Sequence, residues 1–155
     1  YLNTLALLYL MAGGELNKLH EVAESLERSF DPVCVNAAAE FIQPADCINV
    51  TARGPALAAA RQIALTLMEG ARCKASAFAA GAFRHGPFEV SGPGHLAIVL
   101  AARGRTGDLC LNLAEELAGK GSRVLLLTDC DKTPSGANLF KLRFPYHGDE
   151  HLFPF

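Results

Sequence analysis

The segment CINVTARGPALAAARQIALTLMEG, residues 47–70, decides the fold of this chain. It opens with a short, largely apolar run, Cys47 to Ala52, which is typical of a strand buried on both faces. Arg53-Gly54 forms a turn, and Pro55 stands at the first position of a helix, where proline is favoured. The stretch of alanine and leucine that follows predicts a helix from Pro55 to Glu69, stopped by Gly70. Strand, turn and helix in this order predict a β-to-α unit.

The same alternation continues along the chain. Apolar runs at residues 96–101, 124–128 and 139–142 predict three further strands. Residues 108–120 predict an amphipathic helix whose inward positions are Leu109, Leu113, Ala114 and Leu117. Residues 72–80 stay open between an irregular segment and a short helix. We therefore predict an α/β fold, a three-layer αβα sandwich around a parallel sheet of four to five strands.

Three helices are predicted ahead of this unit, over residues 1–11, 14–30 and 32–41. In the second helix, the apolar residues that recur at helical spacing are Leu16, Leu19, Ala23, Leu26 and Phe30. Residues 1–44 are thus expected to be helical, and residues 45–155 to form the α/β domain.

The ligand edge of such a domain can be placed from the order of its elements. Parallel sheets bind ligands at the carboxyl ends of their strands, near the point where the strand order reverses. This edge is predicted to carry residues 51–54 and 102–108. The chain contains neither GxGxxG nor GxxxxGK[ST], so the pattern does not indicate a nucleotide site.

Composition narrows the classes of partner. The 155 residues are 50% hydrophobic and 19% charged, with a net charge of −2, which is typical of a globular domain. This balance gives no general attraction to nucleic acid or to an anionic membrane, and we expect neither as a partner. The apolar Tyr1–Met11 is too short to span a bilayer and has no basic start of a signal peptide. The five cysteines contain no CxxC spacing and read as reduced thiols of a cytoplasmic protein.

We expect no metal site and no cofactor. His147 and His151 are four residues apart, but Gly148 and the nearby prolines argue against a helix that would present both.

Two residues carry the chemistry. Glu69 is the sole acidic residue between Asp46 and Glu89, and it ends an otherwise apolar helix. The helix dipole disfavours negative charge there, which suits Glu69 to taking up and passing on a proton; the alternative is an exposed side chain or a pair with Arg72. His85 precedes Gly86-Pro87, a rigid turn that would fix its imidazole as an acid or base. The alternative is a histidine bonded to nearby backbone, and His95 carries a weaker functional signal still.

These residues stand in a pattern that resembles the SIS (sugar isomerase) family, most of all the second SIS half of glutamine–fructose-6-phosphate aminotransferase-like proteins. The matching motifs are Ala52-Arg53-Gly54, Leu67-Met68-Glu69 and AAGAFRHGP at residues 79–87. The resemblance implies a flavodoxin-like fold, with residues 1–44 as the helical connection from a missing first SIS half. Residues 45–155 would then be the second SIS domain, truncated at its C-terminus.

The resemblance also implies roles. Glu69 matches the base that moves a proton between C1 and C2 of a sugar phosphate, as in an isomerase, a deaminase or a deglycase of fructosamine 6-phosphates. His85, sixteen residues later, matches the histidine that helps to open the sugar ring in the neighbouring subunit's site, which implies a homodimer. The implied substrate-binding residues are Arg53, Gly54, Gln62, Thr66 and Arg84.

The chain departs from the family pattern at several of these positions. Thr66 replaces a lysine, and Gln62, Ser76 and Ala82 replace glutamates. The loop at residues 103–108 keeps only the Thr106 hydroxyl among those expected to bind a phosphate. A second hypothesis is therefore a SIS module that senses a sugar phosphate in a regulator without catalysis.

Overall fold

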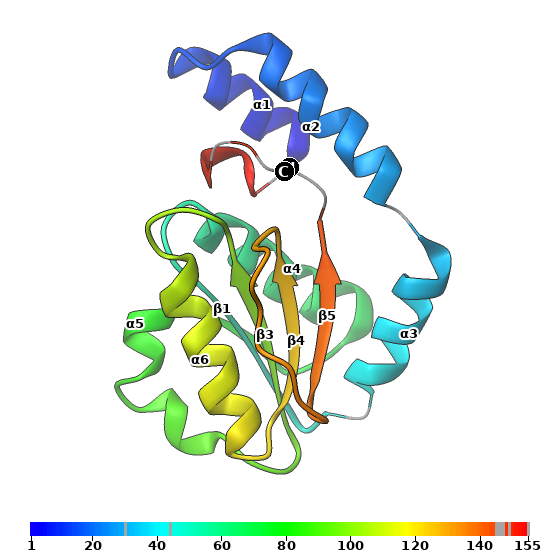
Figure 1. Ribbon diagram of the computed structural model, residues 1–155, viewed down its shortest axis with the longest axis vertical. Helices are drawn as coiled ribbons and strands as arrows, with labels where there is room; N and C mark the ends of the chain where they lie inside the picture. The colour runs from blue at the N-terminus through cyan, green and yellow to red at the C-terminus, as the bar shows by residue number, and fades with distance from the viewer. Residues whose placement is uncertain (30, 44, 145–147, 149, 155) are drawn as a thin grey trace.

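The fold is known from a computed structural model that describes residues 1–29, 31–43, 45–144, 148 and 150–154. Three helices come first, followed by alternating strands and helices (Figure 1). The elements in chain order are α1 (Leu2–Met11), α2 (Leu16–Ser29), α3 (Pro32–Ile42), β1 (Cys47–Ala52), α4 (Ala56–Ala71), β2 (Ala75–Ala79), α5 (Ala80–Phe83), the 3-10 helix η1 (Pro87–Val90), β3 (His95–Ala101), α6 (Gly107–Gly119), β4 (Arg123–Thr128), β5 (Leu139–Arg143) and the 3-10 helix η2 (Glu150–Leu152).

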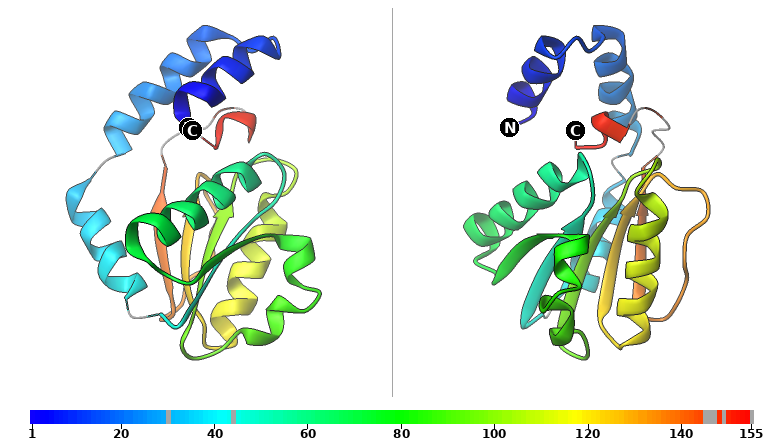
Figure 2. Two further views of the ribbon diagram at one scale, coloured as in Figure 1. Left: turned by 180° about the vertical axis from the view of Figure 1, so that it is seen from behind. Right: turned by 90° about the vertical axis from the view of Figure 1, so that its left-hand side faces the viewer.

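The five strands form one parallel sheet in the order β2-β1-β3-β4-β5. The α/β prediction is therefore confirmed, and the sheet has the larger of the two expected strand numbers. The chain leaves β1 toward β2 on one side and later builds outward from β3 on the other, so the strand order reverses between β1 and β3. All carboxyl ends lie at one edge, beneath α1, α2 and η2 (Figures 1 and 2).

Two hydrophobic cores cover the two faces of the sheet. On one face, Val50 and Ile98 pack with Ala60 and Ala64 of α4. On the other face, Val99 and Leu126 pack with α5 and α6. Alternate residues of each strand point to opposite faces, so β3 and β4 contribute to both cores. Helices α4 and α6 thus form the outer layers of an αβα sandwich (Figure 2).

β2 occupies part of the stretch that the sequence left open. Its residues, Ala-Ser-Ala-Phe-Ala, carry a weak strand signal, because alanine is depleted in strands. Pairing with β1, for example Val50 with Ala77, supplies the hydrogen bonds that make this segment an edge strand.

Helix α4 ends two residues later than predicted. Gly70 stays inside the helix, and Arg72 takes the left-handed conformation at φ 54°. The backbone N–H of Cys73 donates to the carbonyl of Leu67 at 3.1 Å, so the residue after Arg72 bonds back to the last turns of the helix. An interior glycine costs a helix only about 1 kcal/mol, so this capping bond rather than Gly70 sets the end.

Two predicted helix faces are wrong in part. Leu109 is 47% exposed, because α6 directs Cys110, Leu113, Ala114 and Leu117 inward. In α2, Val22 and Ser25 are buried, whereas Leu16 is 56% and Leu26 39% exposed. Helix α2 lies above the carboxyl edge (Figure 1), and most of its described residues are exposed. Phe30 of the predicted face and His147 of the histidine pair lie outside the described residues.

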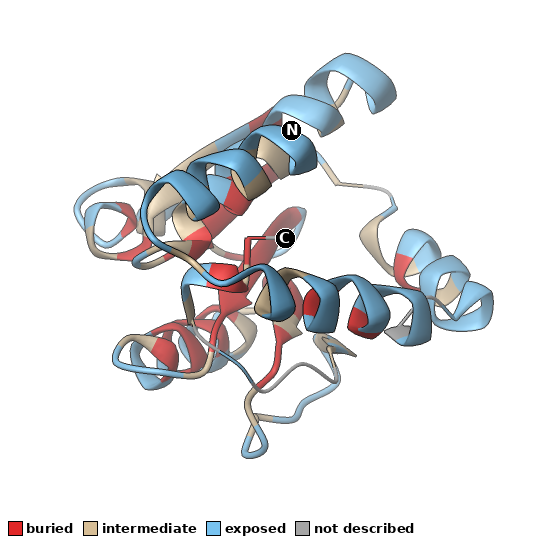
Figure 3. Cartoon of the chain, turned by 90° about the horizontal axis from the view of Figure 1, so that it is seen from above, coloured by how far each residue is buried: buried red, intermediate tan, exposed pale blue. Residues whose placement is uncertain are grey.

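Helix α1 is apolar on every side, yet it has no buried residue. It runs across the top of the molecule and is almost wholly exposed in Figure 3. No helix in the described ranges combines the length and apolarity that a membrane crossing requires.

Candidate functional site

The reversal point between β1 and β3 brings two loops together at the carboxyl edge. Gly54 follows β1 with φ 59°, and a Cβ atom placed on it would lie 3.7 Å from the Thr106 Oγ1 atom. Thr106 precedes α6, and its hydroxyl makes no capping bond to that helix. The predicted ligand edge is therefore assembled from both loops, with the N-terminus of α6 facing it.

Arg53 places a cation at this edge. Its Nη2 atom lies beside Gly81, 3.2 Å from where a Cβ of that residue would stand. Its Nε atom is buried and has no hydrogen-bond partner among the described residues. A guanidinium, a threonine hydroxyl and a helix N-terminus are the donors that bind a phosphate or carboxylate group. The edge is thus chemically suited to an anion.

Arg103, in the loop after β3, forms hydrogen bonds and an ion pair within the chain. The Arg103 N–H donates to Asp129 Oδ1 at 2.5 Å, and Arg103 Nη2 donates to Asp131 Oδ2 at 2.6 Å. Arg143 also donates to Asp131. The carboxylate of Glu150 in η2 lies against Gly104. These acidic groups neutralise Arg103, whereas no ion pair involves Arg53 in the described ranges.

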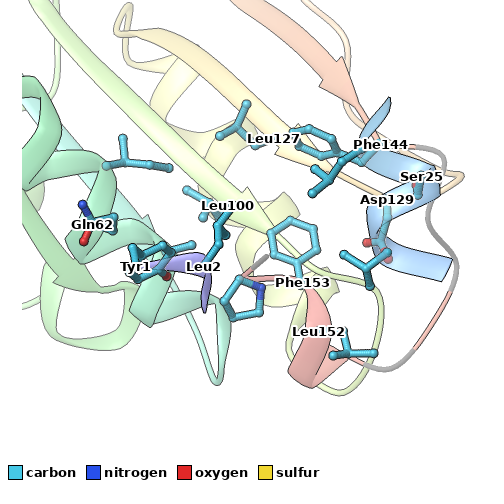
Figure 4. A pocket seen from close by; sticks show the side chains of 15 residues that line it. Tyr1, Leu2, Ser25, Gln62, Leu100, Leu127, Asp129, Phe144, Leu152 and Phe153 are labelled. Atoms are coloured by element: carbon cyan, nitrogen blue, oxygen red, sulfur yellow. The ribbon is translucent and has the colours of Figure 1, made fainter. Parts of the chain in front are cut away.

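A mostly apolar cavity of about 250 Å³ lies next to this edge, between α1, α2, α4 and the C-terminal segment (Figure 4). Polar groups are few: Ser25, Asp129 and Gln62. The full lining is Tyr1, Leu2, Val22, Ser25, Leu26, Ala59, Gln62, Ile63, Leu100, Leu127, Asp129, Phe144, Leu152, Phe153 and Pro154.

Gln62 begins a polar stripe along α4. Gln62, Thr66 and Glu69 are spaced at i, i+4 and i+7, so they share one side of the helix. The Gln62 Nε2 atom donates to Thr66 Oγ1 at 3.3 Å. Thr66 and Glu69 are exposed, and in the described part of the chain Glu69 forms no ion pair, with Arg72 or with any other cation. Three of the predicted site residues are therefore together.

The stripe and the anion edge are far apart. Arg53 and Gly54 precede α4, and Glu69 lies in its last turn. The helix separates them by about 20 Å at 1.5 Å per residue, more than the length of a six-carbon sugar phosphate.

His85 lies on the other side of the molecule. It follows α5, whose residues Ala80 and Phe83 belong to the α6-side core, while α4 packs on the opposite face. His85 is exposed, and its backbone N–H donates to the backbone carbonyl of Ala82 at 3.0 Å. Arg84, which is predicted to bind substrate, donates to Glu116 of α6 through two bonds of 2.6 and 2.9 Å. The hydrogen bond from Arg84 lowers the pKa of Glu116.

The thiols and acids near these places offer no other chemistry. Burial raises the pKa of the Cys110 thiol to about 11, although Arg53 opposes this shift, and burial also raises the pKa of Cys130. Both shifts disfavour the thiolate, which is the nucleophilic form of cysteine. Across the residues that the structure describes, no three histidine, cysteine or acidic side chains gather as metal ligands.

A sequence model of the SIS domain matches residues 41–141, more than half of the chain. The chain belongs to the SIS-domain family. This match begins within α3 and contains every predicted site residue, whereas α1 and α2 lie outside it.

The chain is also similar in sequence to individual proteins. It is 33% identical over 90 residues to the isomerizing glutamine–fructose-6-phosphate aminotransferase of Rhizobium leguminosarum bv. viciae. This alignment covers 58% of the chain but only 14% of the aminotransferase, so the SIS domain corresponds to a small part of that protein.

Two solved structures share the fold. The C-terminal domain of glucosamine-fructose-6-phosphate aminotransferase from Francisella tularensis superposes with a TM-score of 0.69 at 19% identity, over 84% of this chain and 36% of that one. The sugar isomerase domain of an RpiR transcription factor from Sphaerobacter thermophilus gives 0.62 at 20% identity, over 83% and 71%. An enzyme and a regulator therefore use this same fold.

Sequence reasoning missed Glu116. It lies 32 residues after Arg84, and helical periodicity gives no sign of a contact over that separation. The only signal was an acidic residue on the outer side of the helix at residues 108–120.

Proposed function

We propose that this SIS domain supplies the proton-transfer face of a phosphosugar-converting enzyme. Glu69 would move a proton between C1 and C2 of a ketose or amino sugar phosphate, as in an isomerase, a deaminase or a fructosamine 6-phosphate deglycase. The observation that carries the proposal is the stripe of Gln62, Thr66 and Glu69, which ends in an exposed carboxylate without an ion-pair partner in the described ranges.

The chemistry needs only groups of this kind. With a ketose, the Glu69 carboxylate takes a proton from C1, and the electron pair forms the C1–C2 double bond of an enediol while O2 gains a proton. Glu69 then returns the proton to C2 while O1 loses its proton and the C1–O1 double bond of the aldose forms; the proton that O2 gains and the proton that O1 loses are exchanged with water. Gln62 and Thr66 would hydrogen-bond the sugar hydroxyls, and His85 would pass a proton to the ring oxygen. Acid–base groups of this type contribute roughly 10² to 10⁴ in rate, and no cofactor takes part.

The distance between Glu69 and His85 bears on how many subunits form the site. Glu69 and His85 belong to opposite layers, so we propose a homodimer in which His85 reaches the neighbouring subunit's Glu69. Because α4 keeps Arg53 and Gly54 away from Glu69, the substrate at Glu69 has its phosphate held by residues other than these two. Arg53 and Gly54 stay predicted ligands of an anion at the carboxyl edge.

The test is hydrogen exchange at C1. Fructose 6-phosphate and a fructosamine 6-phosphate are incubated with the protein in D₂O, and loss of the C1 proton signal is followed by NMR. We expect Glu69→Gln to slow exchange by about 10² to 10⁴. Glu40 provides the matched control, because it too lies third from the end of a helix and is exposed. Wild-type exchange no faster than that of Glu69→Gln on these sugars would sink the enzymatic proposal.

A sensor of sugar phosphates is the second candidate. It is favoured by the anion edge at Arg53 and Thr106, which needs no base, and by threonine at position 66 where the family pattern has lysine. In this case calorimetry would detect binding of a sugar phosphate that Arg53→Ala abolishes and Glu69→Gln leaves unchanged, with no exchange at C1.

A further inference from the structure

The turn that carries His85 is tied to α6 by one ion pair. Arg84 Nη1 lies 2.6 Å from Glu116 Oε2, and Nη2 lies 2.9 Å from Oε1, so both planar groups are engaged edge to edge. Arg84 follows α5 directly, and Glu116 lies near the end of α6. A paired contact of this form fixes direction as well as distance.

Aromatic residues also pack on both sides of His85 in the sequence. Phe83 is fully buried, with its ring centroid 5.8 Å from that of Phe78 and 6.2 Å from that of Phe88. The Lys120 ammonium lies 4.1 Å from the centre of the Phe88 ring. The chain is thus anchored on both sides of His85, while the imidazole itself is exposed.

The ion pair contributes little to stability. The Arg84 side chain is 37% exposed and that of Glu116 46%, and exposed pairs are screened by solvent. Its main effect is geometric, because it fixes the backbone next to the imidazole. Gly86 follows His85 with φ 125°, a backbone conformation that favours glycine, and leads into η1 (Pro87–Val90).

We propose that Glu116 is a positioning residue for His85 and acts through Arg84. This inference rests on the proposed function, in which the His85 imidazole must reach a fixed point outside its own subunit. It also changes the predicted role of Arg84: the guanidinium orients the turn that presents His85 rather than contacting the sugar.

A charge exchange tests this directly. We expect Glu116→Gln and Arg84→Glu each to lower kcat for C1 exchange about 10-fold with little change in KM, because misplaced catalytic groups lose rate rather than affinity. The double variant Arg84→Glu with Glu116→Arg restores the pair and should recover kcat to within about threefold. Glu115→Gln, one residue away on α6 and without an ion pair among the described residues, should leave kcat unchanged. If the exchanged pair stays as slow as Arg84→Glu, Arg84 contacts the substrate itself and the inference is wrong.

A second measurement does not depend on activity. The order parameter of the His85 ring is measured by NMR relaxation of ¹³C-labelled histidine, with the signal assigned by His85→Gln. It should fall in Glu116→Gln and stay unchanged in Glu115→Gln; an unchanged value in both overturns the positioning role. The order parameter could fall in Glu116→Gln although the wild type shows no C1 exchange. That result would support the positioning of His85 by Arg84 and Glu116 but contradict the proposed function. Failure of the inference and failure of the proposed function are therefore distinguishable.

Discussion

At the scale of single residues, His95 shows how a histidine can be buried without a catalytic role. It is 3% exposed at the start of β3. The Asn49 amide donates to its Nε2 atom at 3.0 Å, and its Nδ1 atom lies 2.9 Å from the Ser122 hydroxyl. That hydroxyl also accepts the Gly92 N–H at 2.9 Å. An amide nitrogen can only donate, so His95 Nε2 must accept a hydrogen bond. This set of hydrogen bonds fits a neutral imidazole with its proton on Nδ1.

Stability should therefore depend on pH through His95. In the folded protein, burial lowers the pKa of His95 below its usual value of 6.5. Just below pH 6.5, His95 is therefore protonated in the unfolded protein and still neutral in the folded protein. The free energy of unfolding should fall as the pH drops from about 7, at up to about 1.4 kcal/mol per unit, until the lowered pKa is reached. Urea unfolding between pH 5 and 8 measures this slope.

The control for this prediction is the exposed His20. His95→Gln should flatten the pH dependence between pH 5 and 7, whereas His20→Gln should keep it. Equal slopes in the wild type and His95→Gln would assign the effect to other groups.

At the scale of elements, α4 is built for close approach to the sheet. Ala56, Ala60 and Ala64 recur every four residues and are 1%, 0% and 3% exposed. Their small side chains let the helix lie directly on Val50 and Ile98. The outer side carries the polar stripe, so one helix both packs the core and presents the candidate site.

Enlarging a packed alanine of α4 should destabilise the protein. Ala60→Leu adds volume where no space exists, and we expect the free energy of unfolding to fall by about 1–3 kcal/mol. Ala58, exposed on the same helix, is the matched position, and Ala58→Leu should be close to neutral. Chemical denaturation of both variants decides the point, and an equal loss in the two would show that packing on the sheet is not the cause.

Two helical glycines should respond oppositely to alanine. A Cβ on Gly70 would meet nothing within 4 Å, so Gly70→Ala should stabilise the protein by about 0.5–1 kcal/mol. A Cβ on Gly107 would lie 2.6 Å from the Ala102 carbonyl oxygen, so Gly107→Ala should destabilise it. Thermal melting of the two variants gives the signs, and a stabilised Gly107→Ala would contradict the close approach of α6 to β3.

At the scale of the whole molecule, the αβα sandwich keeps the candidate groups apart. The anion edge lies at the carboxyl end of the sheet, Glu69 at the far end of α4, and His85 on the opposite layer. Under the proposed function, a complete site takes His85 from a second subunit. Helix α1 is mostly apolar and has no buried residue, so its apolar surface is uncovered in the single chain.

Mixing inactive variants tests the shared site. Glu69→Gln and His85→Ala should each be inactive as homodimers. After subunit exchange, about half of the dimers are mixed and each contains one intact site, so activity should return to roughly a quarter of the wild-type value. No recovery, together with dimers in sedimentation velocity, would place Glu69 and His85 in the same subunit's site.

The strands were predictable where their signal is local. β1, β3 and β4 are continuous apolar runs bounded by glycine turns, and the structure places them within one residue of the expected limits. β2 was not predictable, since Ala-Ser-Ala-Phe-Ala becomes a strand only by pairing with β1. The burial of Val22 and Ser25 in α2 was missed; both line a cavity with Leu152 and Phe153, which lie far along the chain.

The sequence by itself determined the alternation of strands and helices, the turn at Arg53-Gly54 and the spacing that joins Gln62, Thr66 and Glu69, because each follows from neighbours within about two helical turns. Only the tertiary structure decided that Gly54 meets Thr106 and that Glu116 holds Arg84 beside His85. Chain topology sets contacts over such separations, and it is fixed when both faces of the sheet are buried together.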